Sequence, residues 1–196
     1  MRYLVLSDIH GGSEELAQAL GFFERFKCDA LVLLGDLLNH GPRNRVPETY
    51  APPKVADLLN AHKEHIISVR GNCDSEVDSM VFSFPCNAAY GWLLIPSSQG
   101  LVRVFLTHGH LHKIESAEEI AKLGLTSHDL VLSGHTHISG IFKHASGIIS
   151  LNPGSTTLPK GGTDKGMALI DEESVKLFNL EGELLHELKF ASLFEN

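Results

Sequence analysis

The sequence has few cysteines, no long apolar run and no excess of positive charge. Its three cysteines, Cys28, Cys73 and Cys86, are too few and too scattered for a disulfide framework and favour a reducing compartment. The longest apolar run, Ala30 to Leu34, is far shorter than the roughly 18 residues of a membrane span. The N-terminal run ends in Asp8, which is typical of a buried strand and not of a secretion signal. We therefore expect a cytoplasmic protein with no membrane partner.

Basic residues are outnumbered by acidic ones, 16 to 24, which gives a formal net charge of −8. Such a chain repels a long polyanion at a distance, so we do not expect a nucleic acid polymer as partner. The 196 residues are 43% apolar and 20% charged, the composition of an ordinary folded protein. We find no repeat, low-complexity tract or long linker, and expect a single domain over residues 1–196.

Strand and helix patterns alternate in the first third of the chain. Short apolar runs predict strands at Tyr3 to Ser7, Ala30 to Leu34 and Ile66 to Val69. The first helix is expected to have Ser13 as its N-cap, and a second helix is expected to begin at Pro52 and Pro53. Strands separated by helices in this order predict parallel pairing.

The second half of the chain is richer in strands. We predict strands at Leu101 to Leu106, Leu130 to Leu132, Ile138 to Lys143, Ile148 to Leu151, Gly166 to Ile170, Val175 to Leu180 and Leu184 to Phe190. One helix, from about Ser116 to Leu123, interrupts them, and Glu181-Gly182 suits a tight hairpin. The simplest architecture is an α/β domain with two packed sheets covered by helices on the outside.

Metal-ligand side chains follow five of the predicted strands. The segments are Asp8-Ile9-His10, Gly35-Asp36, Gly71-Asn72-Cys73-Asp74, Thr107-His108 and Gly134-His135-Thr136-His137. Sites in open α/β sheets gather outside the carboxyl ends of the strands, so these five loops are expected to converge. Each motif alone is common in turns that have no catalytic role. All five in order, each at a strand end, favour a functional site.

The candidate ligands are two carboxylates, four imidazoles and one amide oxygen: Asp8, Asp36, His10, His108, His135, His137 and Asn72. Seven protein ligands are too many for one zinc ion, which takes three or four. They suit two six-coordinate divalent ions if one carboxylate bridges the pair. Because the set holds nitrogen and oxygen but no thiolate, it favours manganese, iron or zinc over a structural zinc cage.

This ordered series of motifs resembles the calcineurin-like metallophosphoesterase superfamily over nearly the whole chain. Three longer stretches, Gly35 to Asn44, Val69 to Asp78 and Asn152 to Ser155, are similar to the small bacterial YfcE-type phosphodiesterases. The resemblance implies a four-layer α/β/β/α sandwich of two mixed sheets. It also implies two divalent metal ions, most often Mn²⁺, with iron, zinc or nickel as alternatives.

The resemblance further implies how the ligands divide between the ions. One ion is expected on Asp8, His10 and His137, the other on Asn72, His108 and His135, with Asp36 as the bridge. Spacing alone does not assign ligands to one ion or the other.

The resulting hypothesis is a metal-dependent phosphoric diester hydrolase that acts on a small phosphodiester. A hydroxide bridging the two metals attacks the phosphate, with no covalent enzyme intermediate. Asp36, Asn72, Cys73 and Asp74 are the candidate catalytic residues, and Asn72 is also a candidate donor to the phosphate. Many family members have histidine where this chain has Cys73, and a thiol is a poorer acid, which favours easily departing leaving groups. The resemblance leaves Asp74 without its usual histidine partner.

Three residues are candidates for substrate binding: Asn39, Arg43 and Arg70. For Asn39 and Arg43 the alternative is a role in loop structure, and for Arg70 it is a surface ion pair at a strand end. His110 and His112 lie close to the site in sequence and are candidates for a supporting shell. Asn152 to Ser155 is expected to form a turn that supports the site.

Three other functions fit the same motifs less well. A protein-interaction scaffold, as in the small retromer subunit, has an impaired metal site, whereas all seven ligands are present here. Nucleases of the superfamily are generally longer, and this acidic chain shows no basic stripe. A phosphomonoesterase or protein phosphatase is the third alternative, and Cys73 favours diesters over it. A homo-oligomer is possible through Phe82 to Pro85 or Leu193 and Phe194, with ordinary packing as the equal alternative.

Overall fold

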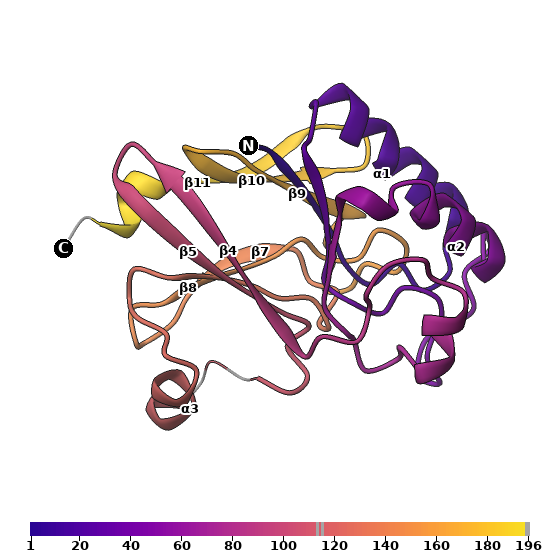
Figure 1. Ribbon diagram of the computed structural model, residues 1–196, viewed down its shortest axis with the longest axis horizontal. Helices are drawn as coiled ribbons and strands as arrows, with labels where there is room; N and C mark the ends of the chain where they lie inside the picture. The colour runs from indigo at the N-terminus through magenta and orange to yellow at the C-terminus, as the bar shows by residue number, and fades with distance from the viewer. Residues whose placement is uncertain (113, 115, 195–196) are drawn as a thin grey trace.

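The structure is a computed structural model that describes residues 1–112, 114 and 116–194, and its strands form two mixed sheets (Figure 1). The first sheet consists, in spatial order, of β11 (Leu184–Lys189), β10 (Ser174–Asn179), β9 (Gly166–Ile170), β1 (Tyr3–Leu6), β2 (Ala30–Leu33) and β3 (Ile66–Ser68). The second consists of β4 (Tyr90–Ser97), β5 (Gly100–Thr107), β6 (Leu130–Leu132), β8 (Ile149–Asn152) and β7 (Gly140–Lys143).

Helices cover the outer faces of the two sheets, α1 and α2 on one side of the molecule and α3 on the other (Figure 1). Their bounds are α1 (Ser13–Arg25), α2 (Pro52–Asn60) and α3 (Ala117–Lys122). Three short 3₁₀ helices, η1 (Lys63–His65), η2 (Glu76–Met80) and η3 (Phe190–Leu193), complete the described elements. The predicted four-layer α/β/β/α order is confirmed. No helix of the described residues is long and apolar enough to cross a membrane.

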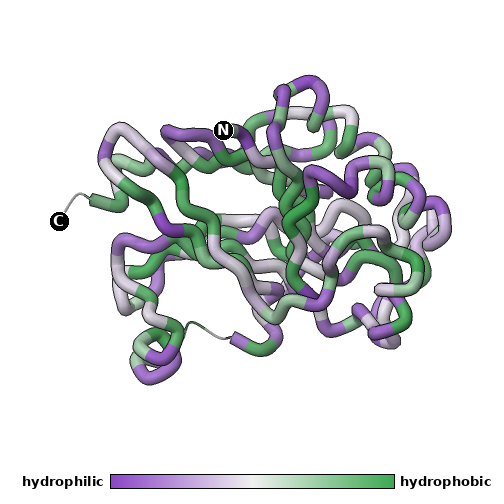
Figure 2. Tube along the Cα trace, viewed as in Figure 1, coloured by the Kyte–Doolittle hydropathy of each residue, from purple (hydrophilic) through white to green (hydrophobic). Residues whose placement is uncertain are grey.

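Alternation along the strands builds a core on each face of a sheet. In β1, Tyr3 and Val5 point into the core between the two sheets, while Leu4 and Leu6 point toward α1 and α2. This is the period-two pattern of a strand covered on both faces. Figure 2 shows the hydrophobic segments gathered along the strands, with polar segments at the outer loops. Because both faces of the sheet are packed, the positions of its strand ends are fixed by the core.

Each sheet contains three neighbouring parallel strands. In the first sheet β1 pairs in parallel with β2, and β2 with β3. In the second sheet β5 pairs in parallel with β6, and β6 with β8. The carboxyl ends of parallel strands meet at one edge of a sheet, and the loops that follow them carry the predicted ligands.

Two local predictions differ from the structure. Ser13 is the first residue of α1 and not its N-cap; Gly12 holds that position, and the Ser13 hydroxyl donates to the carbonyl of Thr49 at 3.2 Å. Strand β4 was not predicted. The Pro52–Pro53 start of α2 and the hairpin at Gly182 (φ +88°) are confirmed.

Three large side chains of the segments proposed for an oligomer interface pack inside this chain. Phe82 and Phe84 lie in the core beneath α1 and α2, and Leu193 lies in the core between the sheets. For these three side chains the structure therefore agrees with ordinary packing.

Candidate metal centre and active site

The loops after five parallel strands bring the predicted ligands to one place where the two sheets meet. Asp8 and His10 follow β1, Asp36 follows β2, and Asn72 follows β3. From the second sheet, His108 follows β5, and His135 and His137 follow β6. Asp8, His10, Asp36, His108 and His137 are all buried. The convergence predicted from the strand ends is thus present in the fold.

Backbone strain is concentrated on these ligands. Among the described residues, six that are not glycine have a positive φ, and five of them are predicted ligands. Their φ values are 52° for Asp8, 47° for His10, 57° for Asp36, 69° for His135 and 61° for His137. Each such residue costs on the order of 1–3 kcal/mol, and strain of this kind clusters at functional sites. The loops therefore hold these side chains in directions that an unstrained backbone would not give.

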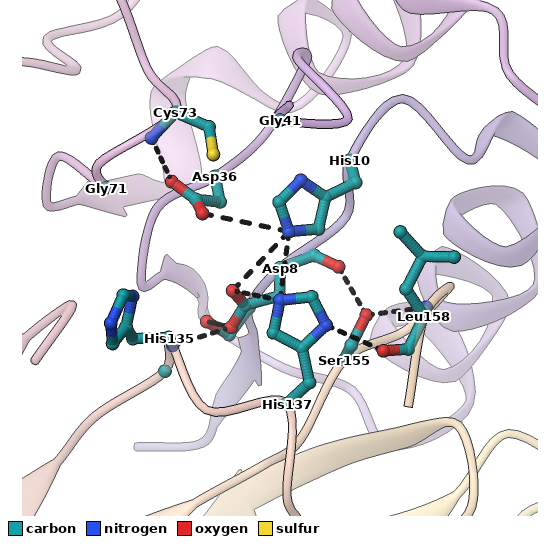
Figure 3. A network of polar contacts seen from close by, with 12 residues as sticks. Asp8, His10, Asp36, Gly41, Gly71, Cys73, His135, His137, Ser155 and Leu158 are labelled. Atoms are coloured by element: carbon teal, nitrogen blue, oxygen red, sulfur yellow. Dashed lines mark hydrogen bonds and ion pairs between the residues drawn. The ribbon is translucent and has the colours of Figure 1, made fainter. Parts of the chain in front are cut away.

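Three histidines, His10, His108 and His137, turn the same ring nitrogen toward the centre of the site, and Figure 3 shows two of them, His10 and His137. The Nδ1 atom of His10 contacts the carbonyl of Asn39 at 2.7 Å, that of His108 the carbonyl of Leu34 at 2.7 Å, and that of His137 the carbonyl of Leu158 at 2.6 Å. A carbonyl only accepts, so Nδ1 carries the proton in each ring. The Nε2 atoms are therefore directed inward, the arrangement in which histidines bind metals.

The inward atoms crowd against two carboxylates. His137 Nε2 lies 3.3 Å from Asp8 Oδ1, and His108 Nε2 lies 3.4 Å from Asp36 Oδ2. The Nε2 atoms of His10 and His137 are only 3.1 Å apart. Asp8 Oδ1 is buried and has no hydrogen-bond partner among the described residues. Lone pairs this close need a cation or protons between them, so the donor set fits divalent metal ions.

The charges of the histidines and aspartates in this cluster shift one another's pKa values. Burial alone would lower the pKa of His108, but its hydrogen bond to Asp36 and the charges of Asp8 and Asp36 raise that pKa to about 9. Burial disfavours the charged form of Asp36, yet the hydrogen bond and charge of His108 hold the pKa of Asp36 well below its usual range. Asp8 is likewise held below its usual pKa, against its burial, by contact with His10.

The structure brings several of the predicted ligands into compact groups. Asp8, His10 and His137 offer ligand atoms within 4.8 Å of one another, the set expected for one ion. A second group is formed by Asp8, Asp36 and His108. Asn72 joins this side through its Oδ1 atom, 3.1 Å from His108 Nε2.

His135 lies beside the cluster and not inside it. Its ring packs near that of His108, with centroids 5.2 Å apart. Figure 3 shows the His135 ring apart from the rings of His10 and His137. The His135 backbone N–H donates to Asp8 Oδ2 at 3.0 Å. Among the described residues, His135 belongs to none of the groups whose ligand atoms lie within 4.8 Å of one another.

Asp74 ties two ligand loops together. Its carboxylate accepts from the backbone N–H groups of Asp36 and Leu37, both at 2.8 Å, and of Gly71 at 2.7 Å. Burial raises the pKa of Asp74, and these donors oppose that shift. With both oxygens occupied by backbone donors, the Asp74 carboxylate holds the loops after β2 and β3 in contact.

Cys73 lies at the edge of the same cluster. Its backbone N–H donates to Asp36 Oδ1 at 2.7 Å, and its sulfur forms a third candidate ligand group with His10 and Asp36. Burial and the charge of Asp36 raise the pKa of Cys73 to about 12. The residue is therefore a thiol at neutral pH and a weak proton donor.

A polar cavity of about 360 Å³ opens beside the ligands. Asn39 and Arg43, two predicted substrate contacts, line it together with Asn72 and Lys160. Asn39 also has a loop role, because its side chain accepts from Gly41 N at 2.8 Å and its carbonyl accepts from His10 Nδ1. The structure thus offers support both for a substrate-binding role of Asn39 and for a role in loop structure.

Arg70 is separated from this polar cavity. Its guanidinium donates to the carbonyl of Asp74 at 3.1 and 3.2 Å, and the residue lines a different cavity with Asn72 and His110. Lys160 was missed by the sequence reasoning. No sequence pattern marked it, because its loop is placed by the bond from the Lys160 backbone N–H to the carbonyl of His137.

The segment from Asn152 to Ser155 supports the site, as predicted. Asn152 Nδ2 donates to the carbonyl of Gly134 at 2.7 Å and to Thr136 Oγ1 at 3.0 Å. Ser155 Oγ donates to the carbonyl of Asp8 at 2.5 Å and accepts from Leu158 N at 2.7 Å. These bonds connect the end of β8 to the loops that carry Asp8 and His137.

Comparisons with known proteins agree with this geometry. Residues 1–175 match the family model of the calcineurin-like phosphoesterase superfamily domain. The chain is 39% identical to phosphodiesterase YfcE of Escherichia coli K12 over 93% of this chain and 94% of that protein. It is 27% identical to the probable metallophosphoesterase YsnB of Bacillus subtilis, over 96% of this chain and 97% of the relative.

Two solved structures show the same fold. The Escherichia coli YfcE phosphoesterase superposes with a TM-score of 0.86 at 37% identity, covering 97% of this chain and all of that one. Vacuolar protein sorting 29 from Cryptosporidium parvum superposes with a TM-score of 0.61 at 16% identity, covering 96% of this chain and 97% of that one. At that identity the second likeness concerns the fold alone.

Proposed function

The chain belongs to the calcineurin-like phosphoesterase superfamily and, with 39% identity to a phosphodiesterase, is a metal-dependent phosphoric diester hydrolase; we propose that it cleaves a small phosphodiester with two divalent cations. One observation carries the proposal: the inward Nε2 atoms of three histidines and two buried aspartates converge beside a cavity with two basic side chains. Manganese is the cation that we propose first, because the donors are nitrogen and oxygen.

We assign the first cation to Asp8, His10 and His137, and the second to Asn72, His108 and His135, with Asp36 between them. The contacts among Asp8, His10 and His137 support the first set, and the contact of Asn72 with His108 supports the second. Asp36 suits the central position because its Oδ2 lies 3.7 Å from His10 Nε2 and 3.4 Å from His108 Nε2.

Two divalent cations would supply a nucleophilic hydroxide for in-line attack and would neutralise the charge on the phosphoryl oxygens. Asp8 and Asp36 balance only part of that positive charge, so the site attracts an anion although the chain carries −8 overall. Arg43 and Lys160 add positive charge on the polar cavity side. Asn72, at the boundary of that cavity, is placed to donate to a phosphoryl oxygen while its Oδ1 faces His108.

Two candidate catalytic residues take narrower roles in this proposal. Asp74 is a positioning residue, since its carboxylate is engaged by the backbone of both ligand loops. Cys73 faces the polar cavity as a neutral thiol and gives little help to a departing oxygen. Arg70, which contacts the Asp74 carbonyl, is proposed to steady the loop after β3 and not to bind substrate.

The test is hydrolysis of bis-p-nitrophenyl phosphate by metal-stripped protein, with and without added manganese, next to p-nitrophenyl phosphate. We expect manganese-dependent cleavage of the diester and weak cleavage of the monoester. Asp36→Asn is expected to abolish the activity, whereas His186→Ala, an exposed change on β11, is expected to leave it intact. Two bound manganese ions with no turnover of either ester would overturn the proposal and favour a scaffold.

The attack by water is tested separately. A single turnover in oxygen-18 water is expected to place the label in the phosphate monoester product, because the P–O bond to the leaving group breaks as the new P–O bond forms. Label that appears only in the released alcohol would rule out direct attack at phosphorus.

A further inference from the structure

A second cavity, of about 510 Å³, lies on the outer face of the second sheet and reaches the candidate site. It lies along β7 and β8 and is bounded on the other side by Gly109, His112 and Ile114. We call it the apolar cavity. It shares His135 with the polar cavity, so the two cavities meet at His135, beside the cluster of metal ligands.

The lining of this cavity differs in chemistry from that of the polar cavity. No Asp, Glu, Lys or Arg is found among its described lining residues, whereas Arg43 and Lys160 line the other. Phe142 and Ile138 contribute large apolar surfaces, and these side chains are 43% and 38% exposed. At one end, His144 Nε2 and Ser150 Oγ satisfy each other at 2.7 Å. The cavity therefore suits an uncharged, flat apolar group.

The aromatic ring in the cavity is held over a glycine. A Cβ at Gly140 would lie 2.7 Å from the Phe142 ring, so only glycine lets the ring fold back along β7. Gly140 pairs with Asn152, whose side chain braces the loop of His135 and His137. The Phe142 ring thus leans toward the end of the sheet that holds the metal ligands. Helix α3 does not cover this ring, because it packs over Phe105 and Val131.

We propose that the apolar cavity binds one ester arm of the substrate, and that this arm is an aryl or similarly flat apolar group. The inference rests on the proposed phosphodiesterase function. A diester phosphate at the metal centre has two arms that leave it in different directions. One arm then enters the polar cavity with Arg43 and Lys160, and the other packs against Phe142 and Ile138. Because the two cavities differ in chemistry, the protein is expected to select an unsymmetrical diester with one polar and one apolar arm.

The first test compares diphenyl phosphate with dimethyl phosphate as competitive inhibitors of the manganese-loaded protein. Wild-type protein is expected to bind diphenyl phosphate more tightly. Phe142→Ala is expected to weaken diphenyl phosphate binding roughly three- to tenfold, the value of one aromatic contact, and to leave dimethyl phosphate binding unchanged. Gly140→Ala displaces the ring without removing it and is expected to act in the same direction. Leu94→Ala, an exposed leucine on β4, is the matched control.

The second test locates the aryl group without catalysis. In zinc-loaded protein labelled with carbon-13, diphenyl phosphate is expected to shift the ring resonances of Phe142 and His144, and dimethyl phosphate is not. Equal inhibition by the two esters, or a Phe142→Ala variant indistinguishable from Leu94→Ala, would overturn this inference. Absence of manganese-dependent hydrolysis would overturn the proposed function, and the resonance shifts would still decide whether the cavity takes an aryl group.

Discussion

The Asp74 carboxylate acts on the site through its bonds to backbone N–H groups. It is buried, and three N–H donors from the loops after β2 and β3 converge on its carboxylate. In Asp74→Asn the amide group replaces one acceptor with a donor that faces these N–H groups. We expect a loss of about 2–3 kcal/mol in the free energy of unfolding and weaker manganese binding. Urea denaturation and manganese titration measure the two effects.

Asp78→Asn is the control for that substitution. Asp78 also accepts from a backbone N–H and a hydroxyl, both of Ser75, but it does so in η2, away from the ligands. It is expected to reduce stability slightly and to leave manganese affinity unchanged. If Asp74→Asn bound manganese as tightly as Asp78→Asn, the positioning role would be wrong.

We propose that Cys73 limits the range of leaving groups. Its thiol, with a pKa raised to about 12 by burial and Asp36, is a poor acid for an ester that needs protonation as it departs. Cys73→His is expected to increase activity toward less activated diesters, because the polar cavity beside residue 73 has room for an imidazole. The measurement is the dependence of kcat/KM on the acidity of the leaving group, with Cys73→Ser as control. An unchanged dependence would contradict the prediction.

At the scale of elements, the end of β8 holds the loop after β6 in place. Asn152 is 2% exposed and donates to both sides of His135 in the chain, at Gly134 and Thr136. Asn152→Ala removes both bonds, and we expect about a tenfold loss in affinity for manganese. Asn179→Ala is the matched control, because that asparagine is 5% exposed and makes similar bonds to Glu183 in the β10–β11 hairpin. Equal metal affinities of the two variants would contradict the prediction.

The turn between β9 and β10 is expected to lose stability in acid through Asp171. Burial opposes its charge, but hydrogen bonds from Lys176 and from the backbone of Glu173 and Ser174 hold the pKa of Asp171 below the usual 3.8. The stabilisation by Asp171 is therefore complete above pH 3.8 and is lost as the pH falls through the lower folded value.

Asp171→Asn is thus expected to be less stable than wild type at pH 7, with a smaller difference near pH 2. Urea denaturation at several pH values measures this, and Asp57→Asn, on the exposed side of α2, is the control. If the difference in the free energy of unfolding between wild type and Asp171→Asn grew as the pH fell, the predicted direction of the pH dependence would be wrong.

How far the fold follows from sequence is clearest at β4. Its residues include Gly91 and Pro96, which weaken a strand prediction, because proline cannot donate to a ladder. β4 is an edge strand that pairs only with β5, and an edge tolerates such a residue. Ser13 is a similar case: its sequence suits an N-cap, but the fold uses its hydroxyl to bind the loop at Thr49. In both cases the tertiary structure, and not the local sequence pattern, determined the conformation.

The candidate site followed from sequence where ligands lie next to strand ends, as with Asp36 and His108. Arg70 lies next to a motif too, but its direction depends on a carbonyl four residues later. Lys160 reaches the polar cavity from a loop distant in sequence, so no spacing pattern marks it. Motifs therefore predicted ligand positions, whereas cavity walls depend on the packing of separate loops.

For the molecule as a whole, the candidate metal centre connects the two sheets. Asp8, His10 and Asp36 follow strands of the first sheet, and His108 and His137 follow strands of the second. Their closest contact across the sheets, between the Nε2 atoms of His10 and His137, is 3.1 Å. A cation held there binds the folded chain only, because the unfolded chain does not bring these ligands together. Metal occupancy and the stability of the sandwich are thus coupled.

We therefore expect manganese to raise the melting temperature of the metal-stripped protein. At a free concentration one hundred times the Kd the stabilisation is about 2.7 kcal/mol, which for a chain of this size is roughly 5–10 °C. Differential scanning calorimetry over a manganese series, with magnesium for comparison, measures it. Asp36→Asn removes the carboxylate that faces both groups of ligands and is expected to abolish the rise, while His186→Ala on β11 keeps it. If Asp36→Asn retained the full rise, the cation would be bound elsewhere, and its link between the two sheets would be wrong.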